Sequence, residues 1–246
     1  MKASYAHYTL HFRQPAGTSR GVLTDKETYF LKLEDEDMPG VFGLGECAVF
    51  RGLSADDVPA YEDKLRELCA NISADKETDL HEFPSIRFGL ETAINDFANG
   101  CRRQPFPSDF TEGMSAIPIN GLVWMGTKEE MLHRIDDKIK AGFTTIKLKV
   151  GAIDTESELD LVRHIRKVFP PEVLTIRLDA NGGFTPDNAL QKLSDFARYG
   201  IHSIEQPIKQ GQWEAMRRIC SESPIDIALD EELIGVNVRS MKEALL

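Results

Sequence analysis

The chain has 246 residues, of which 41% are hydrophobic and 28% charged, an ordinary globular composition that can fill one or two packed cores. Its formal net charge of −11 argues against nucleic acid or an anionic membrane surface as a partner. No run of about 18 apolar residues is present, the N-terminus lacks the apolar stretch of a signal peptide, and the four cysteines lack C-x-x-C spacing, so we expect a cytoplasmic protein with reduced thiols.

Residues 1–50 have the pattern of an antiparallel meander. Partial alternation of apolar residues predicts a first strand over Tyr5–Arg13, and Gln14–Gly17 has the residues of a turn. Further strands are predicted at Glu27–Glu34 and, after a turn at Pro39–Gly40, at Val41–Val49.

Two helices are predicted next. The first begins with Ser54 as N-cap and has acidic residues in its first turn. The second begins near Pro84 and ends at Gly100. Its apolar stripe consists of Ile86, Leu90, Ile94 and Phe97. The stretch 102–113, rich in Pro, Ser, Gly and charge, indicates a boundary between a domain of residues 1–113 and a domain of residues 114–246.

From residue 114 onward, short apolar strands alternate with capped helices. The predicted strands are Ile117–Val123, Thr144–Val150, Leu174–Asp179, Ile201–Gln206 and Ile225–Asp230. The predicted helix starts are capping boxes at Thr127 and Thr155, a cap at Thr185 followed by Pro186, and the residues Trp213 and Arg239. Regular β-α alternation indicates a parallel sheet, open or closed into a barrel.

Ionisable residues stand at or near the C-terminal ends of these strands. Period-2 alternation places them on the face opposite the apolar layer, which is the interior mouth if the sheet closes into a barrel. They are Lys147 and Lys149, Asp179, Glu205 and Asp230, and the last four are separated by 30, 26 and 25 residues. Three carboxylates with oxygen-only ligation suit a hard cation, above all magnesium.

Each of these residues also has a more ordinary interpretation. A single strand-end acid is more often a loop cap or an ion-pair partner, and lysines that alternate with aliphatic residues usually lie on an exposed strand face. Four ionisable residues that recur at the spacing of one β-α unit favour a functional site instead. Arg177 either supports that site or forms a structural ion pair, and Asn181 is interpreted as a loop hydrogen-bonding residue rather than a ligand.

A divalent ion beside lysines suits one kind of chemistry. Magnesium bound to a substrate carboxylate stabilises negative charge on its oxygens and makes the adjacent C–H acidic enough for a lysine to take the proton. A nearby cation and partial burial would both depress the pKa of such a lysine. A lysine base with magnesium that stabilises an ene-diolate is the arrangement of the enolase superfamily.

The sequence resembles the muconate-lactonizing subgroup of that superfamily over the whole chain. The matching motifs are Lys147-Leu148-Lys149, Asp179-Ala180-Asn181, Glu205-Gln206-Pro207 and Asp230-Glu231-Glu232. Within the subgroup it is most similar to the o-succinylbenzoate synthases, through the weaker stretches Gly43–Cys47, Pro84–Glu91 and Ile119–Leu122. The resemblance implies an α/β fold: a (β/α) TIM-type barrel, with about five strands in this chain, and an N-terminal α+β capping domain.

The resemblance also implies roles. Asp179, Glu205 and Asp230 would bind Mg²⁺. Lys149 would take the α-proton and return it to the departing hydroxyl, while Lys147 would steer the substrate carboxylate and keep the pKa of Lys149 low. The segments 45–53 and 18–22 would be capping loops. The substrate would be a small-molecule carboxylate, 2-succinyl-6-hydroxy-2,4-cyclohexadiene-1-carboxylate, dehydrated to o-succinylbenzoate in menaquinone biosynthesis.

Four alternatives stay open: a dipeptide epimerase, another racemase or cycloisomerase of the subgroup, a non-catalytic binding protein on a barrel scaffold, and a metal-dependent aldolase of the same fold, which would not need the two lysines. A homo-oligomer is also left open. The sequence departs from the family in having Glu232 at the position of the serine in the usual Asp-Glu-Ser motif. The family's sixth-strand lysine does not occur in the chain. Because a closed barrel needs eight strands, we expect the 246 residues to be the N-terminal part of a longer polypeptide, aggregation-prone and inactive when expressed alone.

Overall fold

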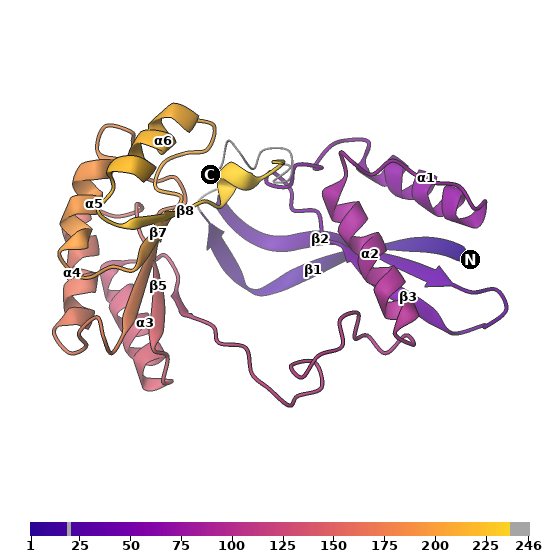
Figure 1. Cartoon of the computed structure of the whole chain (residues 1–246), viewed down its shortest axis with the longest axis horizontal. Coiled ribbons are helices and arrows are strands. Elements are labelled where there is room, and N and C mark those ends of the chain that lie inside the picture. Colours follow the sequence, from indigo (N-terminus) through magenta and orange to yellow (C-terminus); the bar gives the residue numbers. More distant parts are fainter. Residues whose placement is uncertain (19–20, 237–246) are drawn as a thin grey trace. The chain divides into compact units, whose positions relative to one another are not determined.

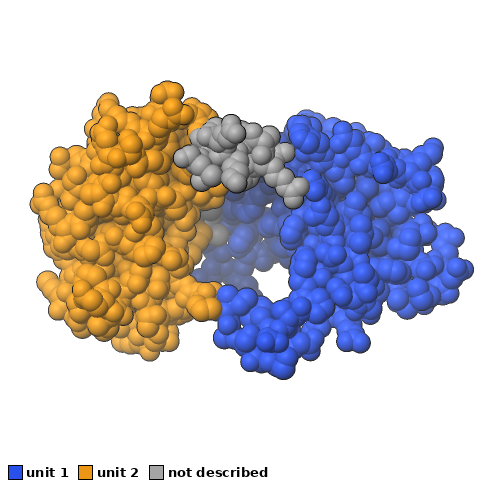
Figure 2. Space-filling view, in the orientation of Figure 1, with its two compact units in different colours: residues 1–16, 22–117 blue, residues 17–21, 118–246 orange. Residues whose placement is uncertain are grey.

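The computed structural model of the chain describes residues 1–18 and 21–236 (Figure 1). The chain divides into two compact units (Figure 2). Unit 1 consists of Met1–Ala16 and Val22–Ile117, and unit 2 of Gly17–Gly21 and Pro118–Leu246. Within the described ranges, no helix combines the length and the apolar composition that a membrane crossing needs.

Unit 1 contains the predicted three-stranded meander. Its strands are β1 (Lys2–Thr18), β2 (Gly21–Glu34) and β3 (Phe42–Cys47), in the sheet order β1-β2-β3. The predicted turn at Gln14–Gly17 is wrong, because β1 continues through these residues. Since β1 lies at the edge of the sheet, Pro15 can occupy it without removing a hydrogen bond between central strands.

Two helices, α1 (Tyr61–Ser73) and α2 (Pro84–Ala98), complete this unit. The predicted start of the first helix at Ser54 is wrong, because the capping side chains are used in the preceding loop. The Ser54 hydroxyl accepts the backbone N–H of Phe50 at 2.8 Å, and the Asp57 carboxylate accepts that of Gly52 at 2.7 Å.

The predicted start of α2 at Pro84 is confirmed, but its predicted stripe is wrong at Ile94, which is 49% exposed. The buried face of α2 instead includes Gly89 and Ala93, because glycines of β3 let the helix approach the sheet closely. A Cβ added at Gly45 would collide with the Gly89 carbonyl group. The core of unit 1 lies around buried side chains of β2, β3, α1 and α2, which are Tyr29, Leu31, Cys47, Tyr61, Leu65, Leu68 and Ile86 among others.

Unit 2 has the predicted β-α alternation. Its strands form a five-stranded parallel sheet in the order β4-β5-β6-β7-β8, which confirms the expected number of barrel strands. They are β4 (Gly121–Val123), β5 (Thr145–Lys149), β6 (Thr175–Asp179), β7 (Ser203–Glu205) and β8 (Asp226–Ala228). The helices are α3 (Lys128–Lys140), α4 (Thr155–Arg166), α5 (Ala189–Ala197), α6 (Trp213–Glu222) and the 3₁₀ helix η1 (Glu231–Leu233) (Figure 1).

The predicted capping residues of the helices in this unit are confirmed only in part. The capping box at Thr127 is confirmed, since its hydroxyl accepts the Glu130 N–H and the Glu130 carboxylate accepts the Thr127 N–H. The box at Thr155 is wrong, because Asp154 is the N-cap and its carboxylate takes the Ser157 N–H at 2.9 Å.

Two other predicted boundaries are also wrong. Helix α5 begins at Ala189 rather than at Thr185, because the Thr185 and Asn188 side chains each accept the other's backbone N–H and close a turn first. The strand predicted from Ile117 begins only at Gly121, and Ile117 and Ile119 are exposed. The helix predicted from Arg239 lies outside the described residues.

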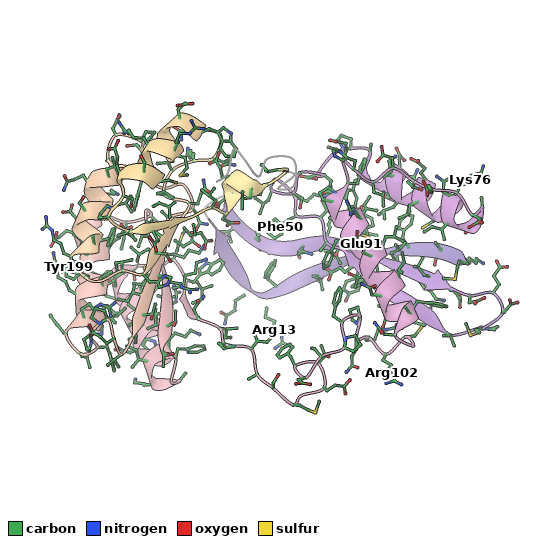
Figure 3. All side chains as sticks on the ribbon, viewed as in Figure 1. Arg13, Phe50, Lys76, Glu91, Arg102 and Tyr199 are labelled. Carbon is green, nitrogen blue, oxygen red and sulfur yellow. The ribbon has the colours of Figure 1, made fainter. Side chains whose placement is uncertain are left out.

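The core of unit 2 lies between the sheet and helices α3–α6, where side chains fill the space between the layers (Figure 3). The apolar residues of the central strands are at most 1% exposed, as their alternation predicts: Ile146, Leu148, Ile176, Leu178 and Ile204. The residues between them in sequence, including both lysines of β5, therefore point to the other face of the sheet.

Candidate active site

The register of the parallel sheet aligns three of the predicted site residues in one row. Lys149 of β5 pairs with Asp179 of β6, and Asp179 pairs with Glu205 of β7. Adjacent strands lie about 4.8 Å apart, so side chains on the same face of such a row can meet. Residues that are 30 and 26 positions apart in the sequence are therefore direct neighbours in the sheet.

The side chains of this row form a network of ion pairs. Lys149 Nζ donates to Asp179 Oδ2 at 2.6 Å and to Asn181 Oδ1 at 2.7 Å. Lys147 Nζ donates to Glu205 Oε2 at 2.7 Å and lies 2.9 Å from Asp179 Oδ2. Asp179 is completely buried and forms ion pairs with two ammonium groups, whereas Glu205 forms one with Lys147.

Burial and charge act in opposite directions on the pKa values of these groups. Burial would raise the pKa of Asp179, but hydrogen bonds from Lys149 and Lys147 outweigh it and hold the pKa below its usual value. Burial raises the pKa of Glu205, and the charges of Asp179 and Asp230 add to that rise against the opposing effect of Lys147. Burial would lower the pKa of Lys147, but Glu205 and Asp179 together raise it.

Asp230 stands apart from this network. It follows β8, is exposed, and its carboxylate makes no hydrogen bond or ion pair with the described residues. As the side chains stand, no three His, Cys, Asp or Glu residues in the described part of the chain are close enough to hold a metal ion. The structure therefore brings Asp179 and Glu205 together and leaves the third predicted ligand at the edge of the site.

The donor chemistry nevertheless fits a hard cation. Asp179 and Glu205 direct carboxylate oxygens at one point, which the Lys147 ammonium group occupies, so two anionic oxygen ligands already converge on a positive charge. Together with Asp230, whose charge acts on Glu205, the three carboxylates exceed the two lysines by one negative charge. Carboxylate oxygens are the ligands that Mg²⁺ prefers in proteins.

The two further residues considered from sequence have different partners. Arg177 is exposed, and its guanidinium donates to Asn120 Oδ1 at 3.2 Å, so it forms neither of the expected contacts among the described residues. Asn181 is a hydrogen-bonding loop residue, as interpreted. It accepts from Lys149 and donates to Glu231 Oε1 at 3.1 Å.

Sequence reasoning missed a layer of polar residues beneath the site. Gln206, Glu231 and Glu232 are all buried, and the Gln206 side chain hydrogen-bonds Glu232 and the backbone at Asp230. One signal was available, because Gln206 and the two glutamates directly follow proposed ligands in sequence. The backbone of Gln206 has a left-handed conformation, with φ of 41°. The identity of the residue does not predict this conformation, so the direction of its side chain could not be predicted from sequence.

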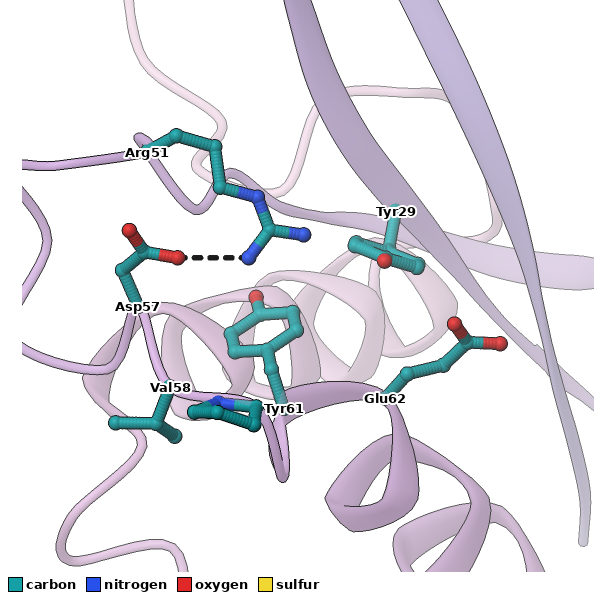
Figure 4. A pocket seen from close by; sticks show the side chains of 7 residues that line it. Tyr29, Arg51, Asp57, Val58, Tyr61 and Glu62 are labelled. Carbon is teal, nitrogen blue, oxygen red and sulfur yellow. Dashed lines mark hydrogen bonds and ion pairs between the residues drawn. The ribbon is translucent and has the colours of Figure 1, made fainter.

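In unit 1, part of the segment 45–53 is tied to its own surroundings. Arg51 donates to Glu27 Oε2 at 3.1 Å and to Asp57 Oδ1 at 2.7 Å, beside a cavity of about 410 Å³ that Tyr29, Tyr61 and Glu62 also line (Figure 4). The backbone N–H of Gly52 and the Arg51 guanidinium hold the pKa of Asp57 below its usual value.

Comparison with known proteins decides the family. The sequence model of the family described as "Enolase C-terminal domain-like" matches residues 130–245. An o-succinylbenzoate synthase of Desulfotalea psychrophila is 39% identical, and the match covers 100% of this chain and 75% of that protein. The chain belongs to the enolase superfamily. It is an enzyme of that superfamily, and the resemblance read from its motifs is confirmed.

Other members of the superfamily are also similar. The crystal structure of MenC from Desulfotalea psychrophila superposes with a TM-score of 0.84 at 35% identity, over 100% of this chain and 75% of that one. The o-succinylbenzoate synthase structure from Thermosynechococcus elongatus, complexed with Mg in its active site, gives 0.77 at 27% identity, over 94% and 69%. An L-Ala-D/L-Glu epimerase of Bacillus subtilis is 32% identical over 79% of this chain and 57% of its own length. The fold class, a (β/α) TIM-type barrel with an N-terminal α+β part, is confirmed.

Proposed function

We propose that the chain is a magnesium-dependent lyase that dehydrates 2-succinyl-6-hydroxy-2,4-cyclohexadiene-1-carboxylate to o-succinylbenzoate, in menaquinone biosynthesis. The observation that carries the proposal is the buried Asp179, held by both lysines of β5 beside Glu205. The similarity to an o-succinylbenzoate synthase at 39% identity supports the choice of reaction. The substrate is a small carboxylate, and the negative charge of the chain favours neither nucleic acid nor an anionic membrane as partner.

In this proposal Asp179, Glu205 and Asp230 hold the magnesium ion. Magnesium, when bound, stabilises the negative charge that develops on the substrate carboxylate. Lys149 takes the proton from the adjacent carbon and delivers it to the departing hydroxyl group, and Lys147 orients the carboxylate. We further propose residues 1–113 as the capping domain and residues 114–246 as the barrel domain.

The contacts of Lys149 are compatible with work as a base. Its two hydrogen bonds go to Asp179, a proposed ligand, and to the neutral Asn181. The Asn181 oxygen accepts a hydrogen bond from Lys149 Nζ and so orients the amino group.

A dipeptide epimerase is the second candidate, favoured by the 32% identity to the Bacillus subtilis enzyme. Epimerisation uses two bases on opposite sides of the reacting carbon, whereas a syn-dehydration can use one lysine.

The deciding experiment incubates the full gene product with the cyclohexadiene substrate and magnesium, and follows the aromatic product by absorbance. A parallel incubation with L-Ala-L-Glu in deuterium oxide detects epimerisation by exchange at the α-carbon. Product formation without such exchange is the expected result. Exchange without aromatic product would make the protein an epimerase.

Calorimetry then tests the ligands. Asp179→Asn, Glu205→Gln and Asp230→Asn should each weaken magnesium binding, because each removes one anionic oxygen ligand. Asp226→Asn is the matched control, since Asp226 is an exposed acid on the same strand that precedes Asp230. Unchanged magnesium affinity in all three variants would overturn the assignment.

A further inference from the structure

Gln206 is a completely buried polar residue that directly follows the proposed ligand Glu205 at the end of β7. Its backbone links three strand ends. The Gln206 N–H donates to the Ala228 carbonyl of β8 at 2.9 Å, and its carbonyl accepts the N–H of Gly182, after β6, at 2.7 Å. The residue therefore lies where the ends of β6, β7 and β8 meet.

The side chain of Gln206 uses all four of its hydrogen-bonding positions. Its Oε1 accepts the backbone N–H groups of Asp230 and Glu232, both at 3.1 Å. Its Nε2 donates to the Ile208 carbonyl at 2.9 Å and to Glu232 Oε2 at 3.1 Å. Glu232 is itself fixed, because its other oxygen accepts the N–H of Gly211 at 2.8 Å. A fully satisfied buried amide of this kind specifies one local structure.

These hydrogen bonds matter most for the position of Asp230. Its backbone lies outside helix and strand, with φ of −130° and ψ of −82°, and its exposed carboxylate has no partner among the described residues that could hold it in place. The direction of the carboxylate thus depends on how the backbone at residues 230–232 is held. Gln206 Oε1 holds that backbone at both ends of the segment.

We propose that Gln206 is a positioning residue for metal binding: it does not touch the ion, but it fixes the Asp230 backbone relative to Glu205 so that both carboxylates can reach one magnesium ion. This inference rests on the proposed function. An amide is required at this position, because a carboxylate could still accept the two N–H groups but would face the Glu232 carboxylate and the Ile208 carbonyl oxygen without a proton to donate.

Magnesium calorimetry on Gln206→Glu, which keeps the size and shape of the side chain, tests the proposal. Outer-shell partners of metal ligands are typically worth about 10–100-fold in metal affinity, and a loss in this range is expected. The magnesium concentration needed for half-maximal activity should rise in parallel, while kcat at saturating magnesium changes little. Gln212→Glu, which adds the same charge elsewhere in unit 2, is the control and should bind magnesium like the wild type.

The double variant Gln206→Glu/Glu232→Gln separates positioning from general damage. It restores a donor opposite the carboxylate and keeps the acceptor for both backbone N–H groups, so it should recover most of the lost magnesium affinity. Weak binding in the double variant, in a protein whose melting temperature has returned to the wild-type value, would overturn the proposal.

The failures of the two proposals are distinguishable. Weakened binding in Asp230→Asn together with wild-type binding in Gln206→Glu overturns the role of Gln206 alone. A wild-type protein that binds no magnesium in calorimetry, or an Asp230→Asn variant that binds it unchanged, overturns the proposed metal site and the role of Gln206 with it.

Discussion

At the scale of single residues, Lys149 and Lys147 occupy successive positions of one strand face yet have different partners. Lys149 bonds an anion and a neutral amide, whereas Lys147 bonds two anions. Two carboxylates favour the charged form of Lys147 and raise its pKa. This difference supports Lys149 as the base and Lys147 as the residue that stays charged to orient a carboxylate.

Lys149→Ala should therefore abolish turnover while magnesium still binds, because it removes a proton carrier and no ligand. A general base contributes about 10²–10⁴-fold, so less than about one hundredth of the wild-type rate is expected. Aromatic product formation measures the rate, calorimetry measures the metal, and the exposed Lys167→Ala serves as control. A Lys149→Ala enzyme with more activity than that would assign the proton transfer to another group.

A second residue-scale prediction concerns Glu158 of α4, which is 1% exposed and has one carboxylate oxygen without a hydrogen-bond partner among the described residues. Burial raises its pKa, although the Gly151 N–H opposes that effect. A carboxyl group whose folded pKa lies above its unfolded value binds more protons in the folded state. Its contribution to stability is therefore lost as the pH rises from the unfolded pKa through the folded one.

Glu158→Gln keeps an acceptor for Gly151 and cannot ionise. The melting temperature of the variant minus that of the wild type should therefore increase as the pH rises from about 4.5, the ordinary glutamate range, and become constant above the folded pKa. Melting curves between about pH 4 and pH 8 measure this difference. A difference independent of pH would mean that Glu158 titrates normally.

The proposed ligands and lysines could be predicted from sequence because strand alternation and a repeat of one β-α unit determine which face and which sheet edge each residue takes. The polar residues that support these side chains could not be predicted. Asn181 and Gln206 act through left-handed backbone conformations, with φ of 43° and 41°, that only the assembled strand ends impose. Whether Asp230 joins the other two carboxylates depends on such contacts rather than on its spacing.

At the scale of elements, the packing of α2 on β3 depends on missing side chains. Gly43 and Gly45 alternate on one face of β3, and added Cβ atoms there would overlap the Ala93 and Gly89 carbonyl groups of α2. Hydrophobic periodicity cannot predict this contact, because glycine contributes no apolar side chain. That is why the stripe expected on α2 includes the exposed Ile94.

Gly45→Ala should consequently destabilise unit 1 strongly, since the helix must move away from the sheet. Overpacking costs about 1–3 kcal/mol and more where backbone is in the way, so about 3 kcal/mol is expected. Gly142→Ala is the control: its φ is 85° but no atom lies near its added Cβ, so only the left-handed backbone is penalised, by about 1–2 kcal/mol. Thermal melts of the two variants compare them. A Gly45→Ala protein as stable as the wild type would show that the interface yields without cost.

Helix starts illustrate the limits of local rules in a different way. Ser54, Thr155 and Thr185 are all good capping residues, yet none caps the helix expected of it. In each case another polar contact is available nearby: the Phe50 N–H for Ser54, the competing cap Asp154, and the Asn188 N–H for Thr185. Thr127 succeeds because its capping box is reciprocal and the chain before it offers no competing carboxylate.

At the scale of the whole molecule, the described apolar core residues fall into two separate clusters. One consists of side chains from β2, β3, α1, α2 and their loops, and the other of side chains from β4–β8 and α3–α6. Each cluster lies inside one compact unit. All five proposed site residues belong to unit 2, so the stability of the site and the stability of unit 1 rest on different cores.

Two cores predict two unfolding steps. Leu65 and Leu148 are both completely buried, one in each cluster, and a buried Leu→Ala substitution costs about 2–5 kcal/mol. Differential scanning calorimetry of the full chain should resolve two transitions. Leu65→Ala should lower one of them by roughly 10 °C and leave the other in place, while Leu148→Ala does the reverse. Magnesium should raise only the transition that Leu148→Ala lowers, because a ligand stabilises the unit that binds it. A single transition lowered equally by both substitutions would mean that the two units unfold as one cooperative body.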